Sequence, residues 1–181
     1  MKKLIYILAS VTFIFTSCKK EQGCTDEKAT NYNIESEEDD GSCVYSISGG
    51  TWTTESIESV GTMSVSMMGI PILDSTINYL ETNSDSLDPY QLVFELTDPG
   101  LDQGSYTEFD QLGYEVEQGS WSLSGDQLTI NSPDTTLVLT VNSVSKSDAS
   151  ISLLIDESET DATGFSYDVN LNQTLYLNRE Y

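Results

Sequence analysis

The chain has 181 residues, with 30 Asp and Glu against 7 Lys and Arg and no His, which gives a formal net charge of −23. A surface this acidic repels nucleic acid and anionic lipid, so neither is expected as a direct partner. Without His there is no Ser–His or Cys–His nucleophile pair, no His metal site and no imidazole proton shuttle. Glycosidase-type carboxylate pairs remain open in principle, but none stands out among the scattered acids, so we assign no catalytic residue and expect a non-enzymatic protein.

Residues 1–17 have the order of an export signal. Lys2 and Lys3 precede an apolar run over residues 4–15, which is shorter than the ~20 residues that span a bilayer. Two small residues then stand directly before Cys18. The segment resembles the lipobox of Bacteroidota-type bacterial lipoproteins, and this implies a signal peptide that is cleaved before Cys18 and lipid, including palmitate, on that cysteine. The alternative is an ordinary secretory signal with an incidental cysteine.

The residues after Cys18 indicate where such a lipoprotein resides. Lys19 stands where an inner-membrane retention signal has Asp, so we expect a lipid anchor in the outer membrane, on its periplasmic or cell-surface face. Residues 18–23 serve as the tether. Loss of Lys2 and Lys3 with the signal takes the net charge from −23 to −25. The remaining ~160 residues are enough for one domain with a real core.

The other two cysteines bound a small acidic module, residues 24–45. If Cys18 carries lipid, Cys24 and Cys43 remain as a pair in an oxidising compartment, where a disulfide is the default. The segment resembles a short module of secreted and surface proteins of marine Bacteroidota-type bacteria, with C-T-D, A-x-N-Y-N and D-D-G-S-C-x-Y in order. It has almost no apolar side chains, so its order depends on the disulfide, which contributes about 3 kcal/mol for a loop of this length.

Oxygen-bearing side chains are dense in this module. They form a set of the kind that Ca²⁺ uses, although the spacing is not that of an EF-hand. One hypothesis is a Ca²⁺ site, and the alternative is that these side chains cap turns and bind no metal. The candidates are Asp26, Asn31, Asn33, Asp39 and Asp40.

Residues 48–181 alternate between apolar and polar in the manner of strands, and no window has helical periodicity. The runs predict about eight short antiparallel strands, at the spacing of a barrel or sandwich. The clearest apolar stripes lie over residues 90–96, 114–123, 128–130, 137–141, 151–155 and 165–177. A parity switch at Gln118-Gly119 suggests a bulge, and Ser124-Gly125-Asp126 predicts a hairpin turn.

Residues 61–84 are harder to assign. Met63, Val65 and Met67 alternate, but residues 68–73 are apolar without a period. We expect an irregular hairpin or an apolar flap beside a cavity mouth. The alternative is a second core strand followed by a loop.

Two phrases of this domain point to a family. Gly50-Thr51-Trp52 resembles the G-x-W of the first lipocalin strand, and residues 119–130 resemble the G-x-W-x-L-x-G-x-x-L-x-I hairpin of lipocalin-like bacterial lipoproteins. The resemblance implies an eight-stranded up-and-down barrel over residues 48–181. It also implies that Arg179, the only arginine, packs over Trp52 and closes one end of the barrel, a contact worth about 1–2 kcal/mol. The alternative is a terminal arginine in solvent.

A lipocalin-like barrel implies a cup that can hold a small hydrophobic ligand, but small barrels also fill their interiors with side chains, and we favour a filled or narrow interior. The leading hypothesis is a monomeric, membrane-anchored lipocalin-like lipoprotein that binds such a ligand. The rival is a surface structural or interaction module that contacts protein or glycan, with Ca²⁺ dependence as one form of it. The cavity candidates are Tyr90, Phe94, Tyr106, Trp121, Phe165 and Tyr167.

Overall fold

The computed structural model describes residues 20–82, 90–97 and 101–181. The chain divides into two compact units, residues 1–44 and 45–181. The described residues are all-β and include no helix of the length and apolarity that a membrane span needs. The export signal and Cys18 lie outside the described residues, so their predicted roles stay predictions.

The first unit is a loop module closed by one disulfide. Its only regular structure in the described part is a parallel pair of two-residue strands, β1 (Gln22–Gly23) and β2 (Glu38–Asp39). Cys24 and Cys43 are bonded, and this confirms the disulfide expected from the sequence. Cys24 is buried within a unit that otherwise has few buried side chains, as expected where covalent closure replaces a core.

The second unit contains a nine-stranded antiparallel sheet in the order β11-β10-β9-β8-β7-β6-β5-β3-β4. A further pairing of β11 with β3 closes eight of these strands into a barrel and leaves β4 attached outside it. The predicted all-β barrel of about eight strands is therefore confirmed. The strands are β3 (Thr51–Met67), β4 (Ile70–Thr82), β5 (Gln91–Leu96), β6 (Gln103–Phe109), β7 (Glu115–Ser124), β8 (Gln127–Asn131), β9 (Thr136–Val144), β10 (Asp148–Thr160) and β11 (Phe165–Glu180).

One of the expectations for residues 61–84, an irregular hairpin, agrees with the structure as far as residue 82. β3 and β4 form a hairpin joined by Met68-Gly69. Both turn residues have positive φ, 51° and 78°, which is the geometry of a tight two-residue hairpin. The aperiodic apolar run arises because the pairing shifts register between Val65 and Ser66, which places one unpaired residue in β4 near the turn.

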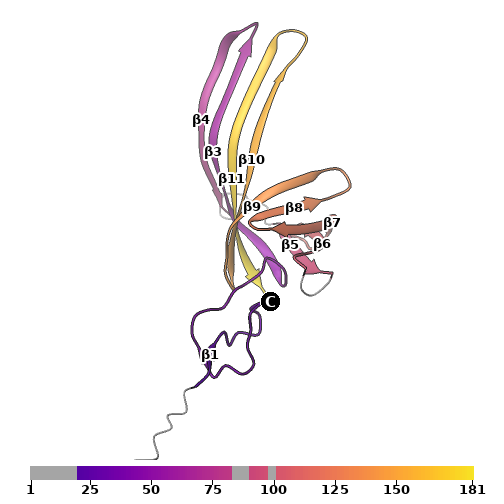
Figure 1. Cartoon of the computed structure of the whole chain (residues 1–181). Helices are drawn as coiled ribbons and strands as arrows, with labels where there is room; N and C mark the ends of the chain where they lie inside the picture. The colour runs from indigo at the N-terminus through magenta and orange to yellow at the C-terminus, as the bar shows by residue number, and fades with distance from the viewer. Residues whose placement is uncertain (1–19, 83–89, 98–100) are drawn as a thin grey trace, which may run out of the picture. The chain divides into compact units, whose positions relative to one another are not determined.

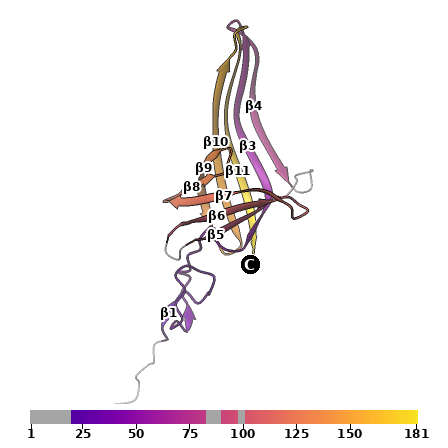
Figure 2. The same cartoon turned by 90° about the vertical axis from the view of Figure 1, so that its right-hand side faces the viewer.

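The strands β3 and β10 are much longer than the short strands expected, and only one end of each belongs to the barrel, as is also true of the long last strand β11. β3 pairs with β5 through residues 51–53 and with β4 through residues 56–67. β10 pairs with β9 only through residues 149–152. The distal parts, together with β4, form a four-stranded sheet in the order β4-β3-β11-β10, which extends beyond β5–β9 in both views (Figures 1 and 2). We call residues 56–82 and 153–174 the arm.

The core lies in the barrel and ends at the base of the arm. Its buried cluster includes Trp52, Phe94 and Trp121, and Leu153 and Leu175 pack against its border. Trp52 donates its indole N–H to the backbone oxygen of Ile47 at 2.7 Å, so its buried polar atom is satisfied. Farther along β10 and β11 no residue belongs to the described core.

The bulge predicted at Gln118-Gly119 is not present there, and β7 has a bulge a few residues earlier instead. The register of β6 with β7 shifts between Glu108 and Phe109, so that Val116 is the unpaired residue, while Gly119 pairs regularly with Tyr106. Gly119 is needed for a different reason, because a Cβ atom there would overlap the backbone oxygen of Asn131.

Candidate functional site

The predicted cavity residues separate into two groups. Phe94, Tyr106 and Trp121 meet inside the barrel, with ring centroids 5.4 Å apart for Phe94–Tyr106 and 5.9 Å for the edge-on Phe94–Trp121 pair. All three are at most 5% exposed, so they fill the interior of the barrel at this level. Phe165 and Tyr167 lie near the end of the arm instead, in the last strand.

The sixth candidate, Tyr90, is 40% exposed and directly precedes β5. Near this strand the surface has a depression of about 600 Å³, lined by residues 48–51 and 93–96. Its lining is part backbone and part side chain, and Phe94 is the only aromatic residue in it. The binding of a small apolar molecule inside the barrel therefore stays a prediction.

Arg179, near the end of the last strand, lies over the ring of Trp52. Its Cζ lies 4.2 Å from the centroid of the Trp52 ring, so the contact implied by the lipocalin resemblance is present. Arg179 as a whole is 5% exposed, and its guanidinium donates to backbone oxygens of Ser46 at 2.7 Å, Ser145 at 2.6 Å and Lys146 at 2.9 Å. Burial lowers the pKa of this guanidinium. The residue thus ties two loops to the last strand, which is a structural role.

Tyr106 is the described residue with the largest pKa displacement. Its hydroxyl donates to Oε2 of Glu108 at 2.5 Å, two residues along the same strand. Burial and the neighbouring carboxylate both disfavour the phenolate, so they raise the pKa of Tyr106. This keeps Tyr106 neutral at physiological pH, and a neutral phenol inside a packed core indicates a structural role.

Two carboxyl groups have a lowered pKa, and both hold turns. The hydroxyl and backbone of Thr163, with the backbone N–H of Phe165, donate to Asp161 and lower its pKa. Hydrogen bonds from the Ser42 side chain and backbone lower the pKa of Asp40. Local turn geometry explains these shifts, so neither group marks a reactive site.

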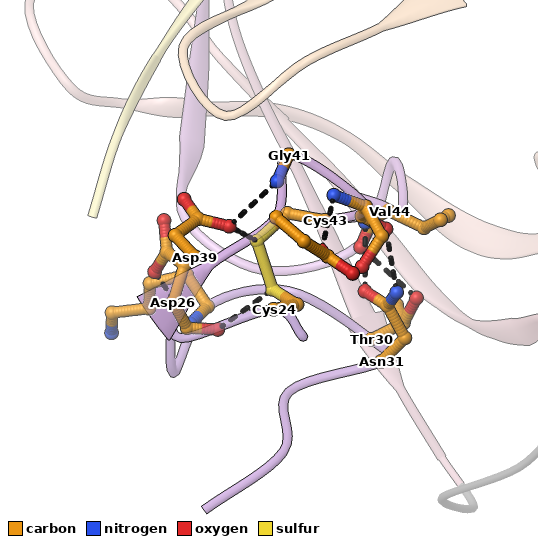
Figure 3. Close-up of a disulfide and its surroundings, with 11 residues drawn as sticks. Cys24, Asp26, Thr30, Asn31, Asp39, Gly41, Cys43 and Val44 are labelled. Atoms are coloured by element: carbon orange, nitrogen blue, oxygen red, sulfur yellow. Dashed lines mark hydrogen bonds between the residues drawn. A yellow bond between two sulfur atoms is a disulfide. The ribbon is translucent and has the colours of Figure 1, made fainter. Parts of the chain in front are cut away.

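The five candidate Ca²⁺ ligands each stabilise the backbone of the disulfide module, and Figure 3 shows three of them, Asp26, Asn31 and Asp39. Asn31 spans the module, because its amide accepts from the N–H of Val44 at 2.8 Å and donates to the oxygen of Ser42 at 2.6 Å. The other four each accept a backbone N–H two residues ahead, which is the Asx-turn pattern; they are Asp26, Asn33, Asp39 and Asp40. In residues 20–82, 90–97 and 101–181, no three acidic or cysteine side chains are grouped to hold a metal ion.

The arm carries the feature that the sequence did not lead us to expect. Residues directly opposite each other on paired strands share a face of the sheet. The pairs Val65–Tyr167 and Val65–Leu73 therefore place three strands' apolar residues on one face, which also holds Leu175 at the border of the core. We call this set the apolar arm face: Met63, Val65, Leu73, Ile77, Tyr79, Ile155, Tyr167, Val169 and Leu171.

The two faces of the arm differ in polarity. Residues of the other parity lie on the opposite face and are mostly exposed, and apart from Val60, Leu80 and Leu154 near the base they are mostly polar. The apolar arm face is only half-buried, by its own neighbours, and its edge residues Tyr79 and Leu73 are 55% and 42% exposed. The polar residues of the opposite face include Thr62, Ser64, Asp74, Thr76, Asn78, Asp156, Ser158, Asp168, Asn170 and Asn172.

The end of the arm is also apolar. The two hairpin turns are joined there, because the N–H of Met68 donates to the oxygen of Gly164 at 2.6 Å. Around this junction Met68, Ile70 and Ile72 are 79%, 68% and 62% exposed. Contiguous exposure of large apolar side chains is typical of interaction surfaces.

No protein-family model matches the chain, and no curated protein or solved structure matches it. The strand pairing by itself defines the class of fold, an eight-stranded antiparallel barrel with an additional strand. The lipoprotein and lipocalin assignments remain resemblances of sequence. The most distinctive candidate site is the apolar arm face, for which the alternation of Met63, Val65 and Met67 was the available sequence signal.

Proposed function

We propose that this protein is a membrane-anchored, non-enzymatic binding protein, in which the barrel is a scaffold and the apolar arm face is the surface that a partner protein covers. The anchor is the lipid expected on Cys18, and the expected location is the outer membrane. The single observation that carries the proposal is the apolar arm face itself. It lies on the side of the sheet that is buried inside the barrel, but on the arm nothing in the described part of the unit covers it.

The strands of the arm carry apolar residues mainly on one face and polar residues mainly on the other. A strand that alternates apolar and polar residues is built to bury one face and to leave the other in water. Each additional 100 Å² of apolar surface left in water forgoes about 2.5 kcal/mol of burial free energy. A face of nine apolar residues spread over four strands is therefore better explained by a partner than by solvent.

The test compares two neighbouring positions on β3 that face opposite ways. Met63→Cys lies on the apolar arm face and Thr62→Cys on the polar face, and each adds a thiol to a chain whose Cys24 and Cys43 are bonded. We expect a maleimide to label Met63→Cys several-fold more slowly in native membranes than in the purified protein. Thr62→Cys should label at the same rate in both. Equal labelling ratios at the two positions would contradict the proposal.

Binding of a small hydrophobic molecule is a second candidate, which the lipocalin resemblance implies. The depression lined by residues 48–51 and 93–96 is the observation that favours it, because it borders the core at Phe94. Mass spectrometry of natively extracted protein separates the two candidates. A retained lipid or pigment in stoichiometric amount would support the small-molecule function, whereas a lipid-modified N-terminal peptide with no other ligand would support the first.

A further inference from the structure

The charges of the arm restrict what can cover it. Residues 56–82 and 153–174 contain eight acidic residues and no Lys or Arg: Glu58, Asp74, Glu81, Asp156, Glu157, Glu159, Asp161 and Asp168. Three of these stand on the apolar arm face at its edges, because Glu157 pairs with Val169, Glu159 with Tyr167 and Glu81 with Ile57. Tyr167 donates its hydroxyl to Glu159 at 3.2 Å, so this carboxylate lies against the apolar residues.

This arrangement argues against two occupants. A second copy would bring an arm of the same eight negative charges onto the first, within a chain whose net charge is already −23. An anionic lipid surface is repelled by the same acids. A partner whose apolar surface is bordered by Lys or Arg would instead be attracted by each carboxylate at the edges of the apolar arm face. Such charge complementarity favours both the association rate and the specificity.

The dimensions of the face suggest the shape of the partner. Four strands spaced ~4.8 Å apart span about 14 Å from the first strand to the last, and residues 56–67 of β3 extend over ~40 Å. An α-helix with its side chains is about 10–12 Å wide and rises 1.5 Å per residue. One helix of about 25 residues would therefore cover the face along its length, in the way that helices cover sheets within domains.

We propose that the apolar arm face binds an amphipathic helix of a partner protein, whose apolar stripe is bordered by Lys and Arg. This inference rests on the proposed function, since it names the chemistry of the partner for the same surface. The apolar stripe covers Val65, Val169 and Leu171, while basic side chains at its border reach Glu157 and Glu159 along the free edge of β10.

The experiment uses the full mature chain with Cys18→Ser, which has no lipid, and a synthetic helix of about 25 residues with Leu on one face and Lys along both borders. Calorimetric titration measures the dissociation constant. Two control peptides are matched to it: one has the same composition in shuffled order, and one has Glu in place of Lys. We expect both controls to bind at least about tenfold more weakly, and binding of the Lys helix to weaken as salt rises.

Two variants on β11 locate the binding surface. Leu171→Gln removes one side chain from the apolar arm face and should weaken the Lys helix by about tenfold, whereas Asn170→Gln, on the opposite face, should leave it unchanged. Trp52 and Trp121 both lie in the barrel, so their near-ultraviolet circular dichroism checks that each variant folds. Equal binding of the shuffled peptide, equal binding of the Glu helix, or equal effects of the two variants would each overturn the proposal.

Other occupants give distinct outcomes. A dimer in sedimentation equilibrium that Leu171→Gln abolishes would assign the face to a second copy, and flotation with zwitterionic vesicles would assign it to lipid; either result overturns the proposal. If Met63→Cys is protected in membranes but the Lys helix shows no preference, the helix proposal fails and the proposed function stands. If Met63→Cys is not protected, the proposed function itself fails.

Discussion

The barrel and the arm are built from the same strands but reach opposite outcomes. At the barrel end, Trp52 of β3, Ile151 of β10 and Leu177 of β11 are at most 2% exposed. At the far end of the same sheet, Met67 and Phe165 are 45% and 38% exposed, although Phe165 keeps the parity of Leu177 and Met67 pairs directly with Phe165. The difference lies in which strands face each end. The strands β5–β9 enclose the barrel ends of β3, β10 and β11 and do not extend along the arm. Alternation decides which face of a strand is apolar, and the other strands decide whether that face is covered.

The largest expected contrast is between two phenylalanines of the predicted cavity. Phe94→Ala removes a fully buried ring that contacts Tyr106 and Trp121, so the free energy of unfolding should fall by about 3–5 kcal/mol. Phe165→Ala removes a partly exposed ring from the arm and should cost less than about 1 kcal/mol. Urea denaturation followed by circular dichroism measures both. Similar losses would mean that the arm is packed as tightly as the barrel.

Arg179 sharpens the same contrast at the closed end of the barrel. Arg179→Met keeps much of the packing on Trp52 but leaves the backbone oxygens of Ser46 and Ser145, which accept part-buried hydrogen bonds, without this donor. We expect a loss of about 1–3 kcal/mol, because hydrogen bonds from a charged donor contribute about 1.5–3 kcal/mol and water can partly replace them here. Thermal unfolding measures the change. If Arg179→Met left the thermal stability unchanged, the guanidinium would contribute nothing to the stability of this end of the barrel.

Local stability should differ along single strands. Residues 153–160 of β10 pair only with β11, and in the described part β4 pairs only with β3, so each strand has an edge without a neighbour. In the protein without its partner protein, amide hydrogens of β4 and of residues 153–160 in β10 should exchange about 100-fold faster than those of β7 and β8. The strands β7 and β8 pair with a neighbour on both sides. Hydrogen exchange read by mass spectrometry resolves these segments. Uniform protection from end to end of β10 would contradict the division into barrel and arm.

The sequence predicted much of the barrel because its signals are local. Two features follow from the local sequence pattern, the turn at Gly125 and the long last strand. The contact of Arg179 with Trp52 follows from a motif shared with lipocalin-like proteins. Phe165 and Phe94 were both candidates for one cavity, but the structure places Phe165 on the arm and Phe94 in the barrel. Phe165 has the same parity as core residue Leu177, but it stands ten residues before Leu175, or ~33 Å along the strand.

The arm could not be predicted because its existence depends on long-range pairing. Whether residues 56–67 of β3 pair with β5 or with β4 decides between a taller barrel and an uncovered sheet, and both choices use the same apolar residues. The turn at Met68-Gly69 was the local signal, but Met at positive φ is an uncommon choice for such a turn. The acidic edge of β10 was equally ambiguous in a chain with acids throughout.

The smallest expected effect concerns two tyrosines that each donate to a glutamate. Tyr106 donates to Glu108 inside the barrel, and Tyr167 donates to Glu159 on the arm. The pKa of each tyrosine is raised, mainly by burial for Tyr106 and mainly by the hydrogen bond for the exposed Tyr167. Because the folded state of Tyr106 holds its proton more tightly than the unfolded chain, its contribution is complete below about pH 10 and is lost as pH rises above that value.

The two substitutions should therefore separate at alkaline pH. Above about pH 10 the free energy of unfolding of the native chain should fall by up to about 1.4 kcal/mol per pH unit from Tyr106 alone. Tyr106→Phe should flatten this fall, since it removes a phenolic proton that the unfolded chain releases at a lower pH than the folded protein does. Tyr167→Phe should flatten the slope much less, because the pKa of Tyr167 is raised mainly by a hydrogen bond that water screens and not mainly by burial. Urea denaturation at pH 9, 10 and 11 measures the slopes, and an equal flattening by both variants would show that the arm face is as dry as the core and hence already covered.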